Sequence, residues 1–379
     1  MIGAGQLRGD RVSRVIEHTP HRKRTLLMLG VLAAILVLTA CAGPDRLGLE
    51  SVVDSDLPQN SLDPAGPDAR SIDNLWRLVF WIATGIFVMV EAALLFAVFR
   101  FRRRKGVDRP VKQARGNARL EIVWTIIPAM ILAAVAVPTI ATLFDLRAAP
   151  EPDENALQIE VTGHQWWWEF HYPEYGFTTA NELHIPAGRA VYLTMTSADV
   201  IHSFWVPQLS GKRDLVPGRT TNLTLEADEP GIFFGQCAEF CGLAHADMRH
   251  RVFAETETGF EAWAVAQAEP ATPPTEGPAA AGWETFQISC ASCHTIDGIS
   301  TVAELAPNLT HFASRTTFGG ASFANTDEHL REWLNNPLDL KPMRPDYNDL
   351  AKGRVLGMPD LGLTDQQIDE LIAFLDTLE

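Results

Sequence analysis

The chain has 379 residues, which is enough for two or three domains. Its formal net charge of -16 argues against a role in nucleic-acid binding, and an acidic surface suits a basic soluble partner. The five cysteines all fall in short motifs with other chemistry, so none remains for an ordinary structural disulfide.

The first 41 residues have the layout of a secreted protein's leader. Residues 1–24 are polar and end in HRKR, residues 25–40 are uncharged and mostly apolar, and Cys41 follows. The run LTAC that ends at Cys41 resembles a bacterial lipobox, whose cysteine is lipidated and becomes the new N-terminus. The alternatives are an ordinary signal peptide or a short extra membrane helix. Residues 41–70 are rich in Pro, Asp and Gly, and we interpret them as an exposed tether.

Two apolar runs predict a membrane hairpin. Residues 78–99 are interrupted only by Glu91, and residues 122–144 carry no charge. Each is long enough for a bilayer core, which takes about 20 residues. The basic segment 100–119 between them predicts a cytoplasmic loop, so both ends face outward. Glu91 is a functional candidate because carboxyl groups are costly inside a membrane, but a bond to another subunit explains it equally well.

Residues 157–253 have the texture of an all-β domain. Short alternating runs such as LQIEV and AVYLTMTS are separated by Gly, Pro and Asp, which predicts a sandwich or barrel. The stretch also contains three consecutive tryptophans, Trp166 to Trp168. Because side chains alternate along a strand, we expect at least one of them to be exposed or at a partner surface.

The run CAEFCGLAHADM carries a candidate copper site. Cys237 and Cys241 are followed by His245 and Met248, and His202 offers a second imidazole from far upstream. Thiolate, imidazole and thioether are soft ligands that suit copper. The alternative is a disulfide between the two cysteines, which needs neither the histidine nor the methionine.

A proline-rich segment, residues 268–282, predicts a semi-extended linker to a third domain. That domain begins with CASCH, in which Cys290 and Cys293 precede His294. Cys-x-x-Cys-His indicates covalent haem c, because two thiols add to the vinyl groups and the imidazole binds iron. The alternative, a redox disulfide, does not need the histidine.

The sixth iron ligand is expected to be a methionine downstream. Met358 precedes a predicted final helix that Thr364 caps with Gln367 three residues later, an arrangement common in small class I cytochromes c. Met343 also qualifies by chemistry, but it lies farther from that helix. We predict Met358 as the ligand, with Met343 as the second candidate.

Together these motifs resemble subunit II of the haem–copper cytochrome c oxidases, over nearly all of the chain from about residue 60. The resemblance implies a dinuclear copper centre, CuA, on a Greek-key cupredoxin barrel. Its implied ligands are the bridging thiolates of Cys237 and Cys241, the imidazoles of His202 and His245, and, as weak axial ligands, Met248 and the carbonyl of Glu239.

The same resemblance implies further roles. Trp166 stands where the family has its electron-entry tryptophan, and Asp199 resembles an acidic position near the copper site. Glu239 also resembles a residue that helps hold magnesium at the subunit I boundary. Pro307 resembles the proline whose carbonyl orients the haem histidine. Glu121 resembles the glutamate at the mouth of a proton channel into subunit I, and the alternative is a solvated glutamate favoured by the helix dipole.

The sequence therefore predicts a multidomain chain: a transmembrane helix hairpin, an all-β cupredoxin and an all-α class I cytochrome c domain. The expected boundaries are 1–40 for the signal peptide, 41–70 for the tether, 71–147 for the hairpin, 150–267 for the copper domain, 268–282 for the linker and 283–379 for the haem domain.

The predicted function is the electron-entry subunit of a proton-pumping terminal oxidase. Electrons pass from cytochrome c or a cytochrome bc complex through haem c and CuA to subunit I, where oxygen is reduced to water. Expected partners are subunit I, the other oxidase subunits and membrane lipid, but no nucleic acid. The expected location is a bacterial cell membrane, with both cofactor domains outside the cytoplasm. A quinol-oxidase subunit would lack the copper ligands, and a copper chaperone or sensor would need neither the membrane spans nor the haem motif.

Overall fold

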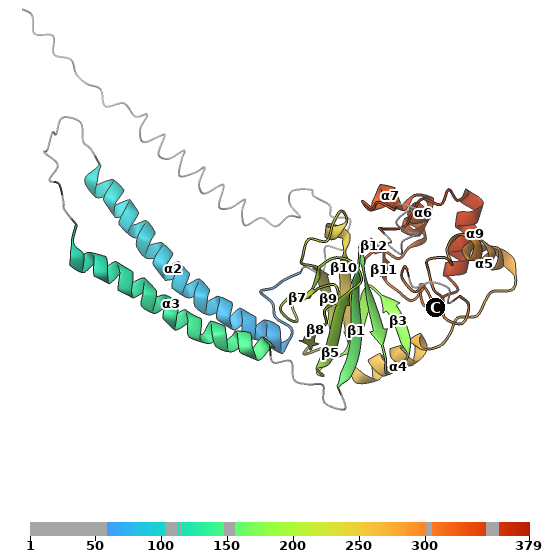
Figure 1. Ribbon diagram of the computed structural model, residues 1–379, viewed down its shortest axis with the longest axis horizontal. Helices are drawn as coiled ribbons and strands as arrows, with labels where there is room; N and C mark the ends of the chain where they lie inside the picture. The colour runs from blue at the N-terminus through green and yellow to red at the C-terminus, as the bar shows by residue number, and fades with distance from the viewer. Residues whose placement is uncertain (1–58, 103–112, 114–115, 148–155, 301–304, 346–355) are drawn as a thin grey trace, which may run out of the picture. The chain divides into compact units, whose positions relative to one another are not determined.

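The computed structural model describes residues 59–102, 113, 116–147, 156–300, 305–345 and 356–379. The predicted signal peptide, Cys41 and most of the tether lie outside these residues. Within them the chain forms a helix pair, a β-domain and a helical C-terminal domain (Figure 1).

The two predicted spans are single long helices. α2 (Pro67–Phe101) has 35 residues and α3 (Ala118–Arg147) has 30, and both are long and apolar enough to cross a membrane. Pro67 opens α2, where a missing N–H costs nothing. Their apolar side chains are largely exposed in the isolated chain, as expected for surfaces that face lipid or other subunits.

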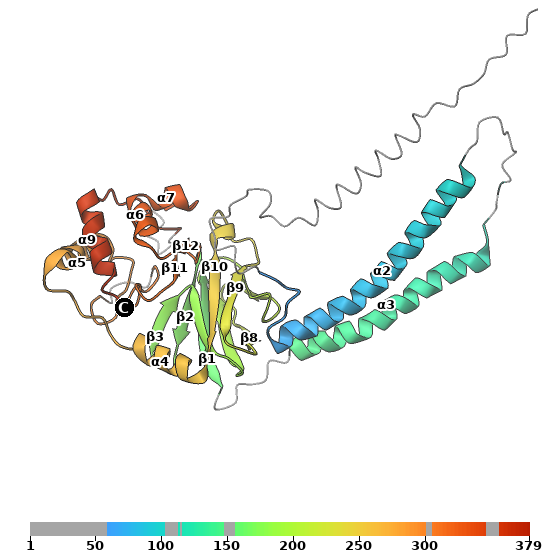
Figure 2. The same ribbon diagram turned by 180° about the vertical axis from the view of Figure 1, so that it is seen from behind.

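The β-domain is built from two five-stranded sheets (Figure 2). The first has the order β3-β2-β1-β5-β8 and the second β4-β10-β9-β6-β7. The strands are β1 (Leu157–His164), β2 (Trp167–Tyr172), β3 (Phe177–Ala180), β4 (Glu182–Pro186), β5 (Val191–Ser197), β6 (His202–Trp205), β7 (Arg213–Leu215), β8 (Thr221–Leu225), β9 (Gly231–Cys237) and β10 (Arg249–Glu255).

Alternation of buried and exposed residues explains why these segments are strands. In β1 and β5 every second residue is buried, so each strand gives one face to a shared apolar core. β1 pairs parallel with β5 and β10 with β4, while the other ladders are antiparallel. The prediction of an all-β domain is confirmed. The helix α4 (Glu257–Gln267), capped by Thr256, ends it.

The C-terminal domain is helical, as predicted. Its helices are α5 (Gly277–Ser289), α6 (Asp327–Asn335), α7 (Pro337–Leu340) and α9 (Asp365–Leu375), and a small hairpin joins β11 (Thr317–Phe318) to β12 (Phe323–Ala324). The predicted capping box of the last helix is present, with Thr364 and Gln367 bonded to each other's backbone.

The linker is shorter than the sequence suggests. α5 begins at Gly277, so the last six residues of the range 268–282 are not linker. Pro278 lies in the first turn of that helix, where proline is tolerated because its N–H would have no partner. Proline content alone therefore overestimates the extended segment.

Candidate copper and haem sites

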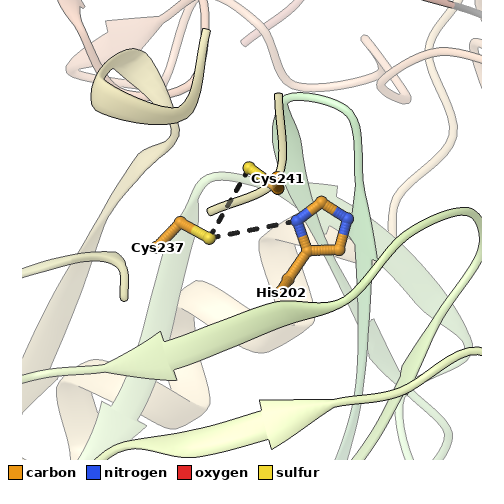
Figure 3. Close-up of side chains that lie close together, drawn as sticks. All are labelled: His202, Cys237 and Cys241. Carbon is orange, nitrogen blue, oxygen red and sulfur yellow. Dashed lines mark hydrogen bonds between the residues drawn. The ribbon is translucent and has the colours of Figure 1, made fainter. Parts of the chain in front are cut away.

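The copper-site residues converge at one end of the β-domain. Cys237 is the last residue of β9, Cys241 lies in the loop after it, and His202 begins the neighbouring strand β6. Among the residues that the structure describes, His202, Cys237 and Cys241 form the one group of three ligand atoms lying within 4.8 Å of one another. Figure 3 shows the imidazole Nδ1 of His202 and both sulfur atoms pointing toward one another.

The remaining predicted ligands surround the same two sulfur atoms. The Cys237 Sγ lies 3.8 Å from the Cys241 Sγ, 3.9 Å from the His202 Nδ1 and 3.2 Å from the Glu239 carbonyl oxygen. The Cys241 Sγ lies 3.6 Å from Nδ1 of His245, in the 3-10 helix η2 (His245–Asp247), and 3.7 Å from the Met248 Sδ. Both cysteines are free, and their separation is well beyond a disulfide bond of about 2.05 Å.

Electrostatics prepare the thiols for metal binding. The Cys241 thiol and the His202 ring both hydrogen-bond the Cys237 sulfur and lower the pKa of Cys237. The hydrogen bond with the Cys237 sulfur in turn raises the pKa of Cys241, and burial and the negative charge of a Cys237 thiolate raise it further. A cation between them offsets that negative charge, so this donor set fits a positively charged copper pair.

Asp199 hydrogen-bonds the His202 ring nitrogen that lies opposite the thiols. Its Oδ1 lies 2.7 Å from the His202 Nε2, and the backbone N–H of Gln165 donates to its Oδ2. Burial opposes ionisation of Asp199, but these hydrogen bonds outweigh it and lower the pKa of Asp199. The carboxylate thereby fixes the ring with Nδ1 toward the sulfurs.

The carboxylate of Glu239 lies away from the thiols. Its carbonyl oxygen contacts the Cys237 sulfur, while its half-exposed carboxylate lies 3.6 Å from the Lys212 ammonium. The backbone atom and the side chain of this one residue therefore face different surroundings.

All three tryptophans of the triplet are buried, although we expected at least one at a surface. Trp168 packs inside the β-domain against Phe204 and His250. Trp166 and Trp167 line the same cavity as the haem-motif residues. The partner surface that they contact is therefore the chain's own C-terminal domain.

That cavity has a volume of about 400 Å³ and its lining fits a haem. Cys290, Cys293 and His294 line it, as does the buried Arg315, whose Nε has no partner among the described residues. The His294 Nδ1 lies 2.8 Å from the Pro307 carbonyl, which leaves Nε2 for iron and bears out the expected turn. Burial lowers the pKa of His294, which keeps the imidazole neutral for ligation.

Both candidate methionines line the cavity, but they belong to different cores. Met358 packs against the core of the C-terminal domain, and its sulfur accepts a hydrogen bond from the Trp333 indole at 3.2 Å. Met343 packs against the core of the β-domain.

Glu121 lies in the first turn of α3. The Asn117 N–H donates to its Oε1 at 3.3 Å, and the Asn117 side chain accepts from the N–H groups of Arg119 and Leu120. The Glu121 side chain thus bonds to the backbone at the start of its own helix.

Sequence reasoning missed two residues that join the domains. Lys341 and Glu182 are both buried, and both make hydrogen bonds across the boundary between the β-domain and the C-terminal domain. Neither lies in a motif. Lys341 follows the last residue of α7 and Glu182 is the first residue of β4, and a lone charged residue at the end of an element identifies no partner.

Three protein families match the three parts of the chain described above. Residues 57–142 match the family "Cytochrome C oxidase subunit II, transmembrane domain", residues 176–254 match "Cytochrome C oxidase subunit II, periplasmic domain", and residues 279–379 match "Cytochrome c".

Similar proteins span most of the chain. The chain is 37% identical to the cytochrome c oxidase subunit 2 of Alkalihalophilus pseudofirmus, over 91% of this chain and 94% of the relative. It is 34% identical to the cytochrome c oxidase subunit 2 of Bacillus sp. PS3, over 84% and 91% respectively. A quinol oxidase subunit 2 from Bacillus spizizenii is also 34% identical, over 63% of this chain and 71% of the relative.

Proposed function

The chain belongs to the cytochrome c oxidase subunit II family, and we propose that it is the electron-entry subunit of a proton-pumping terminal oxidase. In this proposal electrons pass from a donor through haem c and a dinuclear CuA centre to subunit I, where oxygen is reduced to water. The convergence of two free thiols, two imidazoles, a thioether and a carbonyl at one point is the observation that supports it most strongly.

Family membership establishes the coarser features. The chain is a membrane protein that works with other oxidase subunits, and its domains bind copper and haem c. When bound, these cofactors supply one-electron transfer. The complete thiol pair supports a cytochrome c oxidase rather than the quinol oxidases, which also occur among the relatives.

We propose these roles for the protein's own residues. Cys237, Cys241, His202, His245, Met248 and the Glu239 carbonyl hold the coppers, while Cys290, Cys293, His294 and Met358 hold the haem. Trp166 lies on the electron path, Glu121 marks the channel mouth, and the Glu239 carboxylate helps to bind magnesium.

We also propose an electron donor and a membrane location for the chain. The acidic charge of the chain suits a basic donor such as cytochrome c, and a cytochrome bc complex is the alternative. The basic segment 100–119 supports a cytoplasmic loop and hence cofactor domains on the outer side of a bacterial cell membrane.

Metal and haem analysis of the purified oxidase tests the proposal. We expect two coppers and one covalent haem c in this subunit. Cys237→Ser should abolish the paramagnetic signal of an electron shared by two coppers and leave the haem c spectrum intact. One copper per chain, or a Cys237–Cys241 disulfide in the active oxidase, would contradict the assignment.

A further inference from the structure

A seam of hydrogen bonds joins the haem domain to the copper domain. On the haem side the seam consists of the hairpin turn 319–322 and Lys341, and on the copper side of the backbone at Trp166, Asp247 and Arg249. The copper-side residues flank the metal site, since Asp247 precedes Met248 and the Trp166 indole N–H donates to the Cys241 carbonyl at 3.0 Å.

Lys341 lies at the centre of the seam and is only 3% exposed. Its Nζ donates to the carbonyls of Trp166 at 2.9 Å, Asp247 at 2.9 Å and Gly319 at 2.8 Å. An ammonium has three donors, and here all three are used, two on the copper domain and one on the haem domain. A buried cation is tolerated only where such partners replace its water.

The backbones on the two sides approach closely beside Lys341. A Cβ on Gly320 would lie 2.6 Å from the Asp247 carbonyl oxygen, and the φ of Gly320, +77°, also favours glycine. The Gly320 carbonyl accepts from the Arg249 N–H at 2.9 Å, and the Ser322 hydroxyl donates to the Asp247 carbonyl at 3.0 Å. The turn therefore fits against the copper domain in one position.

A second contact lies apart from Lys341. The buried carboxylate of Glu182 accepts from the Thr316 N–H at 3.0 Å and from the hydroxyls of Thr316 and Thr317, both at 2.6 Å. It ties the same hairpin to strand β4 of the copper domain. Loss of Lys341 alone should therefore loosen the seam without releasing the haem domain.

We propose that Lys341 is a positioning residue for electron transfer: it holds the haem cavity against Trp166 and so sets the separation of the two cofactors. The inference rests on the proposed electron path. The haem that Cys290, Cys293 and His294 would hold would supply one electron, and the copper pair that Cys237 and Cys241 would hold would accept it. No bond forms or breaks, and a reduced cytochrome supplies the next electron.

The contacts explain why one side chain has this influence. Trp166 connects the seam to the copper loop through two polar groups, because its carbonyl accepts from Lys341 and its indole donates to the Cys241 carbonyl. Trp166 also lines the haem cavity. Without the ammonium, the carbonyls of Trp166, Asp247 and Gly319 each lose a donor, and separation of the domains becomes less costly.

Lys341→Met in the complete oxidase tests the proposal, with Arg331→Met as the matched control. Arg331 is an exposed cation on the haem domain that pairs with Asp369 rather than with the copper domain. Two quantities are measured: the rate of copper reduction after photoreduction of the haem, and hydrogen exchange at the Arg249 amide, whose partner is Gly320 across the seam.

We expect Lys341→Met to slow the electron transfer measurably, because the rate of electron tunnelling falls steeply as the separation of the two cofactors grows. Exchange at the Arg249 amide should become faster, while the haem potential and the copper spectrum stay unchanged. Lys341→Arg, which keeps a cation and its donors, should give an intermediate rate, and Arg331→Met should match the wild type.

Wild-type rate and wild-type Arg249 exchange in Lys341→Met would overturn the proposal, as would a slow rate with unchanged exchange. If that variant does not assemble, Gly320→Ala opens the seam without altering charge and should show both effects, and their absence also overturns it. If haem reduction is not followed by copper reduction in the wild type, the proposed function fails instead.

Discussion

At the scale of single residues, hydrogen bonds from the protein decide which side chains face the cofactors. Asp199 orients His202 toward the sulfurs, and the Pro307 carbonyl orients His294 toward the cavity. Met358 is held in a similar way by the Trp333 indole, whereas Met343 lies against Gly357 and the copper-domain core. These contacts lead to two predictions.

Met358→Leu should abolish the weak sulfur-to-iron charge-transfer band and lower the haem potential, because a Met/His ligand pair raises that potential. Met343→Leu serves as the matched variant and should change neither. Visible spectroscopy with a redox titration measures both quantities. The opposite pattern in the two variants would show that Met343 is the ligand.

Asp199→Asn should weaken copper binding by roughly 10- to 100-fold, the usual effect of removing a partner that orients a metal-binding histidine. Copper retention against a competing chelator measures the change. Asp228→Asn, which alters a partly exposed acid paired with Arg70, is the control. Equal retention in both variants would mean that His202 needs no orientation by the carboxylate.

At the scale of elements, one close backbone contact explains how α5 packs on α9, and hydrogen bonds at its first turn explain where α3 begins. Helices α5 and α9 make extensive contact in the haem domain, and Gly282 lies where they meet. Helix α3 starts with Asn117 bonded to its first turn and to Glu121. Each feature depends on one residue and can be tested by one substitution.

Gly282→Ala should destabilise the haem domain by about 1–3 kcal/mol, as overpacking of a core does. Its Cβ would lie 1.9 Å from the Glu370 carbonyl oxygen, so α5 and α9 must move apart. Denaturant unfolding followed by haem absorbance measures the loss. Glu284→Ala, an exposed change on the same helix, should leave the midpoint unchanged. A wild-type midpoint in Gly282→Ala would refute the close packing.

Glu121→Gln should slow proton uptake and leave both metal spectra unchanged. Glutamine keeps an oxygen that can accept from the Asn117 N–H, so the start of α3 is retained while the ionisable group is lost. Turnover measured over a range of pH checks the prediction. Unchanged turnover throughout would leave Glu121 with its helix-capping role alone.

At the scale of the whole molecule, the membrane hairpin and the two cofactor domains form one chain, and the predicted leader agrees with the orientation that the basic segment 100–119 predicts. Cys41 lies outside the described residues, and its lipidation stays a prediction. Intact-mass analysis of the mature subunit should find residues 1–40 absent and a lipid on Cys41. An N-terminus upstream of Cys41 would contradict it.

The sequence by itself predicted the elements and the candidate ligands whose signals are local. Cys237 to Met248 are close in the chain, CASCH spans five residues, and the capping box of α9 spans four. Such short-range patterns need only local geometry to become a site or a helix start, so the copper loop, haem motif and helix start were predictable.

Only the tertiary structure decided what covers Trp166 and where Lys341 binds. The Lys341 ammonium reaches carbonyls at Trp166 and Asp247, which are 175 and 94 residues away in the chain. Every residue has a backbone carbonyl, so the sequence does not show which carbonyls can accept a hydrogen bond from a lysine that is distant in the chain. The seam exists because folding brings these carbonyls to one buried point, where an ammonium must satisfy them.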